Sequence, residues 1–393
     1  MGEVVITKLN GGLGRRLPTK DGVCGIVLMM SSIAGGAIVG NVYKLGSLAD
    51  AESLLITSDY DTTESVLAHH HIKEFFRINP NGTLYVYIGN KTLSYSANVS
   101  SGIKKLLLDT AGEVRSIGAV YNGVVLLDNT ATLAAISTAQ TEANTAFQNH
   151  SPIQVVVDGV MLDGIENMHL LNAKNVSVVL AQNLSIVNFV NGVGDNPWEM
   201  STEVGLVLGA ISKAAVNESI AWVDKFNLFG GDLSIAAVQG SNIVGQETLL
   251  STMNDNGFIT IQSYVGKAGL YFNASHTATE ITSDYANIQN NRVIDKAIRL
   301  IRTALLPDLN SPINVDPTTG KLSPAVVKTF ELKCRRALDV MQGNEEFSAV
   351  NVVVDPDQNI LSTSKLNIQL DITPTGTAEN IAVEIGFVNP FNS

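Results

Sequence analysis

The chain has 393 residues, of which 25 are basic and 37 acidic, giving a formal net charge of −12. Only 16% of the residues are charged while 45% are hydrophobic, a combination that excludes an intrinsically disordered chain. An acidic protein gains nothing from counterion release, so we expect no nucleic-acid partner. The length is sufficient for two or three domains that each bury a core.

The first half of the chain alternates between β-prone and helical patterns. After a short terminal strand at 3–9, the patterns predict strands at 25–30, 83–88, 114–120, 153–157 and 176–180 and helices at 65–76, 101–108, 130–147 and 197–215. Such alternation is typical of an α/β sheet domain, which we place at residues 25–245.

The second half has a different character and predicts a smaller unit at residues 246–375. Its expected elements are strands at 258–264, 267–272, 349–354 and 366–372 and helices at 289–305 and 324–343. Pro324 is expected in the first turn of its helix and Gly343 at its end. In the strand at 366–372, apolar and polar residues alternate, which indicates a sheet with one wet face. Residues 381–387 form a further alternating segment at the C-terminus.

The uncharged stretch between Asp21 and Lys44 is long enough to be considered as a membrane span. Serine and glycine pairs and Asn41 interrupt it, so two buried strands around a turn are expected instead and no membrane insertion is predicted. The N-terminus lacks the basic and apolar regions of a signal peptide. Cys24 and Cys334 show no metal-binding spacing and are expected to be buried thiols.

Residues 9–20 contain a glycine-rich loop that resembles the phosphate-binding loop of sugar-nucleotide pyrophosphorylases. That chemistry requires a helix directly after the loop, so that the helix N-terminus faces the phosphates. Here Pro18 and an apolar strand follow instead. A pyrophosphorylase-like enzyme using residues 11–20 therefore stays open as the alternative function, and an arm joining two strands is preferred.

Other motifs indicate no catalytic, cofactor-binding or metal-binding residues. His70 and Glu74 are one helical turn apart, but the sequence supplies no second ligand cluster. We therefore expect the three histidines at 69–71 to lie on a helix surface, with one or two of their imidazoles semi-buried. The stretch at 355–359 imitates a calcium loop but lacks its glycine and its bidentate glutamate. Ser241 lacks the glycine pattern of a nucleophile elbow. We therefore predict that the protein is not an enzyme.

Four basic residues gather on one predicted helix of this acidic chain. They are Lys328, Lys333, Arg335 and Arg336. Two interpretations stay open: an ordinary solvated face, or a surface that docks onto an acidic protein.

Several segments, taken in order along the chain, resemble the sheath proteins of contractile phage tails and related contractile injection systems, in a compact version. They are residues 6–15, 71–86, 266–294, 355–364 and 374–390. The resemblance implies a mixed α/β outer domain and a C-terminal α/β core. The sheet of this core is completed by strands from neighbouring subunits. It also implies terminal arms at residues 1–24 and 376–393 that leave their own subunit.

On this interpretation each arm carries a short β-prone strand and a glycine hinge. The exchanging residues are expected to be Val4, Ile6, Leu9, Ile381, Val383, Ile385 and Phe387, with hinges at Gly11, Gly12, Gly14 and Gly376. The receiving sheet is expected at Val350, Val352, Val354, Leu366, Ile368 and Leu370, and the basic helix is the candidate tube-facing element. Pairing with another subunit satisfies backbone groups that a free apolar strand would leave unpaired.

The resemblance further implies the partners and the location of the protein. We expect copies of the chain to form hexameric rings stacked into a helical sheath around an inner tail tube protein, with baseplate and terminator proteins at its ends, and without cofactors. The protein would occur in a virion tail or in the cytoplasm of the producing cell. A non-contractile surface or adhesion protein with the same α/β domain would require secretion, for which no signal is visible.

Overall fold

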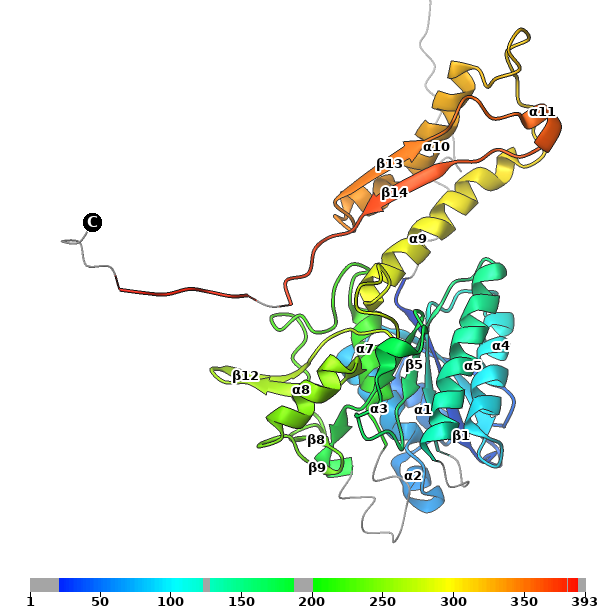
Figure 1. The fold of residues 1–393 in the computed structure, drawn as a ribbon. Coiled ribbons are helices and arrows are strands. Elements are labelled where there is room, and N and C mark those ends of the chain that lie inside the picture. The colour runs from blue at the N-terminus through cyan, green and yellow to red at the C-terminus, as the bar shows by residue number, and fades with distance from the viewer. Residues whose placement is uncertain (1–20, 123–127, 187–200, 380, 388–393) are drawn as a thin grey trace, which may run out of the picture.

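The computed structural model describes residues 21–122, 128–186, 201–379 and 381–387. It consists of an α/β unit built on a large sheet and a smaller C-terminal unit that stands beyond it on helix α9 (Ile288–Leu305) (Figure 1). The α/β fold class predicted from the sequence is confirmed.

A seven-stranded sheet forms the centre of the α/β unit, in the order β10-β6-β5-β4-β1-β3-β2. Its strands are β1 (Val23–Met30), β2 (Val42–Leu45), β3 (Thr83–Asn90), β4 (Ser116–Val120), β5 (Gln154–Asp158), β6 (Val176–Val179) and β10 (Phe258–Ile259). All neighbouring pairs are parallel except β2 and β3. All eight residues of β1 are buried, as expected for a central strand covered on both faces.

Helices cover both faces of this sheet. They are α1 (Leu48–Ser53), α2 (Ser58–Glu64), α3 (Ala68–Ile78), α4 (Tyr95–Asp109), α5 (Asn129–Gln148) and α7 (Val204–Lys213). Successive residues of β1 point to opposite faces: the thiol of Cys24 lies 3.8 Å from the carbonyl oxygen of Leu208 on α7, whereas Gly25 faces Leu106 on α4. Helices α4 and α5 therefore cover one face, and α7 covers the other.

Two glycines let α7 approach α3 closely. A Cβ atom on Gly205 would lie 2.2 Å from the carbonyl oxygen of His71, and one on Gly209 would lie 2.9 Å from that of Phe75. The helix predicted at 65–76 begins later, at Ala68, because Ser65 ends α2 in a left-handed conformation with φ of 53°.

The division expected at residue 245 is wrong, because the α/β unit continues beyond it. After α8 (Glu247–Asp255), β10 pairs with β6 at the edge of the large sheet. The hairpin of β11 (Ile261–Tyr264) and β12 (Lys267–Phe272) contributes buried residues to the same core. A second small sheet joins β7 (Gln182–Asn183), β8 (Ala236–Val238) and β9 (Ser241–Asn242).

The C-terminal unit consists of two helices and a two-stranded sheet. Its elements are α9, the 3-10 turn η3 (Leu306–Asp308), α10 (Pro324–Gly343), β13 (Ala349–Val353), α11 (Ile360–Thr363) and β14 (Gln369–Thr373). Helix α10 begins where the sequence predicts: the hydroxyl of Ser323 accepts a hydrogen bond from the backbone of Val326, and Pro324 occupies the first turn. Leu338 and Met341 of α10 form the core of this unit with Val293 and Ala297 of α9.

Candidate functional site

The small sheet of the C-terminal unit has an apolar inner face and an exposed outer face, which is polar along β14 and mixed along β13. In the antiparallel register, Val350 lies opposite Ile372 and Val352 opposite Leu370. Val350, Leu370 and Ile372 pack against the core formed with α9 and α10, and Val352 is buried on the same face. Asn351 and its partner on β14 face outward. No further strand of the described chain pairs with either outer edge. An isolated two-stranded sheet is only marginally stable, so these edges are suited to accept a strand.

Not every expected receiving residue lies in a strand. Leu366 and Ile368 come before β14 and, with Val354, belong to a second apolar cluster near Phe330. The strand expected at 366–372 starts only at Gln369. The reason is local, because the side-chain amide of Gln358 bonds both backbone groups of Asn367 and takes the place of a partner strand there.

The tail after β14 runs away from both units in an extended path (Figure 1). Its apolar side chains are almost fully exposed, with exposed fractions of 82% for Ile381, 79% for Val383, 96% for Ile385 and 109% for Phe387. The tail residues 381–387 form no strand within their own subunit. A Cβ atom on Gly376 would meet nothing within 4 Å, so neighbouring atoms do not require a glycine there.

The N-terminal candidates lie outside the described residues. They are Val4, Ile6, Leu9, Gly11, Gly12 and Gly14, and the glycine-rich loop at 11–20 lies there with them. The expected arm does not reach residue 24, because Val23 and Cys24 are the first residues of β1 and pair with β3.

The basic residues of α10 divide into two pairs. Lys328 forms an ion pair with Glu331 at 2.6 Å, and Lys333 forms one with Asp308 of η3. Arg335 and Arg336 are exposed and form no ion pair with a described residue. Leu332 and Val340 are also exposed, by 49% and 59%, and follow at helical spacing on the outer side of α10. The outer side of α10 therefore combines apolar and cationic side chains, which the sequence analysis did not recognise.

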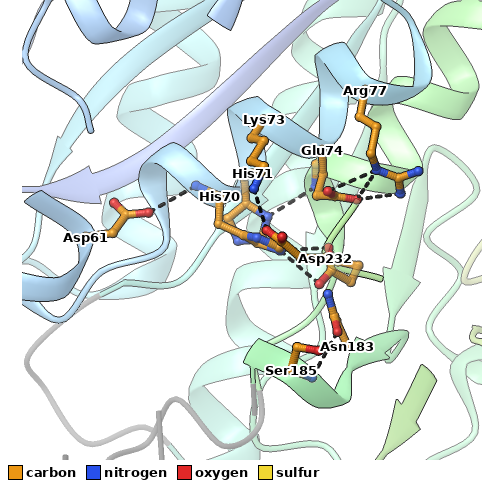
Figure 2. Close-up of polar contacts among 11 residues, drawn as sticks. Asp61, His70, His71, Lys73, Glu74, Arg77, Asn183, Ser185 and Asp232 are labelled. Atoms are coloured by element: carbon orange, nitrogen blue, oxygen red, sulfur yellow. Dashed lines mark hydrogen bonds and ion pairs between the residues drawn. The ribbon is translucent and has the colours of Figure 1, made fainter. Parts of the chain in front are cut away.

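A cluster of buried polar residues surrounds α3 (Figure 2). The ring Nε2 of His70 lies 2.9 Å from Oε1 of Glu203, and both side chains are nearly inaccessible. Asp61 accepts hydrogen bonds from the backbone N–H groups of His69 and His70. All three histidines are buried, whereas a helix surface with only one or two semi-buried imidazoles was expected. No local sequence pattern indicates this burial, because the partner of His70 is 133 residues away.

Electrostatics in this cluster favour a charged histidine. Burial alone would lower the pKa of His70, but Glu203 outweighs it and raises the pKa to about 9. Burial raises the pKa of Asp61 to about 7 despite the hydrogen bonds it accepts. The buried carboxylate of Glu74 bonds Arg77 at 2.6 Å. The His70–Glu203 contact joins α3 to the segment before α7. The charged groups of His70 and Glu74 are therefore paired with groups of the protein itself.

His70 and Glu74 do not form a metal site together, since each has its own partner. Within the described ranges, no group of three or more His, Cys, Asp or Glu side chains is arranged to hold a metal ion. None of the described helices combines the length and the apolarity needed to cross a bilayer.

The DUF2586 N-terminal domain matches residues 1–276, and the DUF2586 C-terminal domain matches residues 284–392. The chain belongs to the DUF2586 family. The gap between the two matches lies just before α9, where the C-terminal unit of this DUF2586 protein begins. No curated protein sequence matches the chain.

Solved structures with the same fold come from contractile injection systems. A chain of the anti-feeding prophage (AFP) baseplate has a TM-score of 0.64 at 16% identity, covering 94% of both chains. The AFP helical sheath in its contracted state has a TM-score of 0.64 at 18% identity, covering 93% of the DUF2586 protein and 92% of that chain. The contracted sheath complex of an extracellular contractile injection system, PVC, has a TM-score of 0.58 at 14% identity, covering 98% and 97%.

These likenesses confirm the sheath fold that the sequence resemblance implies, over nearly the whole length of the DUF2586 protein. They give no support to the pyrophosphorylase alternative.

Proposed function

We propose that this protein is a structural, non-enzymatic subunit of a contractile sheath, which polymerises helically around an inner tube and shortens to drive the tube through a cell envelope. The C-terminal arm, residues 376–393, leaves its own subunit and adds a strand to the sheet of a neighbour. The N-terminal residues before Asp21 act as the second arm.

The observation that carries this proposal is the match between the tail and the small sheet. The tail alternates exposed apolar residues, Ile381, Val383, Ile385 and Phe387, with Ala382, Glu384 and Gly386. Strand β14 of the sheet alternates in the same way, with Leu370 and Ile372 on the inner face and polar residues on the outer face. A strand added at an outer edge would extend both faces without burying a charge.

The free energy gained from such pairing is large compared with that of a single contact. Each backbone hydrogen bond contributes about 0.5–1.5 kcal/mol, and each apolar side chain that moves from water into a core contributes about 1.5–3 kcal/mol. Four exposed apolar side chains are available for burial in the tail. Because one chain both gives and receives a strand, the contact is heterologous and propagates as rings or a helix. Hexameric rings stacked into a sheath are the assembly we propose.

The outer side of α10 is the surface we assign to the inner tube. Arg335 and Arg336 are free to meet carboxylates, and Leu332 and Val340 supply apolar contact beside them. An acidic tube protein is therefore the partner proposed for this side, with baseplate and terminator proteins at the ends of the sheath. The assembled protein would belong to a tail particle built in the cytoplasm of a producing cell.

The experiment that tests the proposal removes residues 379–393. The shortened chain is expected to remain a folded monomer, because the removed residues that the structure describes belong to none of the three apolar clusters. Full-length protein at the same concentration is expected to form tubes under negative-stain microscopy, and the shortened chain none. Tubes formed by the shortened chain would contradict strand exchange by this arm.

A further inference from the structure

A buried lysine connects the start of the described chain to the small sheet. Nζ of Lys296, on α9, lies 2.7 Å from Oδ2 of Asp21 and 2.6 Å from Oε1 of Glu346. Lys296 and Glu346 are each only 6% exposed in their side chains, and Asp21 is 17% exposed. Asp21 directly follows the N-terminal segment, and Glu346 lies three residues before β13. One ammonium group therefore joins two segments that are far apart in the sequence.

A second cation of α9 also contacts Asp21. Arg299, one turn after Lys296 on α9, places its guanidinium 3.0 Å from Oδ1 of Asp21. Two cations from one helix thus meet two carboxylates. Separating them is costly, because it would leave a charge without a partner in a medium that solvates it poorly.

The C-terminal arm departs from the same corner. The backbone N–H of Ser348, two residues after Glu346, donates to the carbonyl oxygen of Thr373 at 2.8 Å. The hydroxyl of Ser348 donates to the carbonyl oxygen of Pro374 at 3.0 Å. Pro374 is the first residue after β14. A short series of contacts, Asp21 to Lys296 to Glu346 and on to Ser348, therefore links the bases of both terminal segments.

We propose that Lys296 transmits tension between the two terminal arms of each subunit during contraction. The covalent path between Asp21 and Pro374 passes through the entire α/β unit, whereas the path through Lys296 leads from Asp21 directly into the C-terminal unit. Force applied to both arms then acts on buried ion pairs and on α9, and the large sheet is spared. This inference rests on the proposed function, since it requires that both arms are held by neighbouring subunits.

The test compares full-length variants in assembled tubes and as monomers. Lys296→Met with Glu346→Gln removes both charges of the Lys296–Glu346 pair and keeps the Asp21–Arg299 pair, so neither carboxylate partner of Lys296 is left without a cation. Its monomer is expected to unfold at nearly the wild-type temperature. Its tubes are expected to dissolve at about half the guanidinium concentration that dissolves wild-type tubes. If Lys296 and Glu346 stabilised only the monomer, the double variant would not lose tube resistance while its monomer kept the wild-type unfolding temperature.

Controls and a milder variant make the result decisive. Lys105→Met with Asp109→Asn removes an exposed ion pair on α4 and is expected to leave tube resistance unchanged. Glu346→Gln alone keeps Lys296 paired with Asp21 and is expected to give an intermediate loss. Tubes of the double variant or of Glu346→Gln that resist guanidinium as well as wild type would overturn the inference and leave strand exchange intact. Failure of the unmodified chain to form tubes would instead contradict the proposed function, and this inference with it.

Discussion

Val352 and Leu370 lie directly opposite each other on β13 and β14 and share the inner face of the small sheet, which packs against α10. Val352 is 2% exposed, whereas Leu370 is only partly buried. At this pair the inner face is therefore less well covered on the β14 side. An apolar strand that paired there would complete the cover over Leu370 and Ile372.

The first prediction concerns the two faces of the tail. Val383→Asp or Ile385→Asp is expected to leave the monomer's thermal unfolding unchanged, because both side chains are exposed. Assembly should be lost, since an aspartate at either position would be buried without a partner in the extended sheet. Sedimentation measures the fraction in tubes.

The matched control is Glu384→Gln, which changes the opposite face of the same tail segment. It is expected to assemble like wild type, because this side chain would face solvent. Equal loss of assembly in Glu384→Gln and Ile385→Asp would contradict the alternation on which the pairing rests.

The outer side of α10 gives the second prediction. Arg335→Glu with Arg336→Glu is expected to reduce binding to an acidic inner tube while self-assembly persists, because both guanidinium groups are exposed and lie away from the small sheet's core. Co-sedimentation with tube protein measures this. Lys333→Gln is the control, since Lys333 is already paired with Asp308. Unchanged tube binding by the variant with Arg335→Glu and Arg336→Glu would contradict the assignment of the outer side of α10 to the inner tube.

Close packing of α3 and α7 gives the third prediction. Gly205→Ala is expected to destabilise the protein by about 3 kcal/mol, because its Cβ would meet the backbone of His71 at 2.2 Å. Gly343→Ala, where nothing lies within 4 Å, is expected to be neutral. Denaturant unfolding measures both, and equal stability of the two variants would show that α7 can shift away from α3.

The pH dependence of stability gives the fourth prediction. The pKa of His70 is about 9 in the folded chain and 6.5 as a free side chain. The folded state therefore holds this proton more tightly, so the stabilisation is complete below about pH 6.5 and is lost as pH rises to about 9. Below about pH 6.5, the raised pKa of Asp61 makes the folded state less stable as pH rises, whereas the lowered pKa of His276 makes it more stable.

Thermal unfolding of the monomer between about pH 7 and pH 9 measures this effect. The unfolding temperature is expected to fall over that interval in the wild type and to stay nearly level in His70→Gln with Glu203→Gln, which removes both charges. A wild-type unfolding temperature that rises with pH across the interval would mean that His70 is neutral when folded.

The sequence predicted the regular elements well and their long-range partners poorly. Strands such as β1 and β12 and helices such as α9 and α10 follow from local apolar patterns and caps. The domain boundary was placed too early because only the pairing with β6 shows that the two residues of β10 belong to the large sheet. The burial of His70 depends on Glu203, and the link at Lys296 depends on Asp21 and Glu346, so no local pattern could reveal either.

The most direct test of strand exchange is a cryo-EM map of tubes assembled from the full-length protein. The account predicts that residues 381–387 of one subunit form a strand against β13 or β14 of a neighbour, with Val383 and Ile385 facing that neighbour's α9 and α10. A map in which residues 381–387 lie against their own subunit's sheet would contradict it.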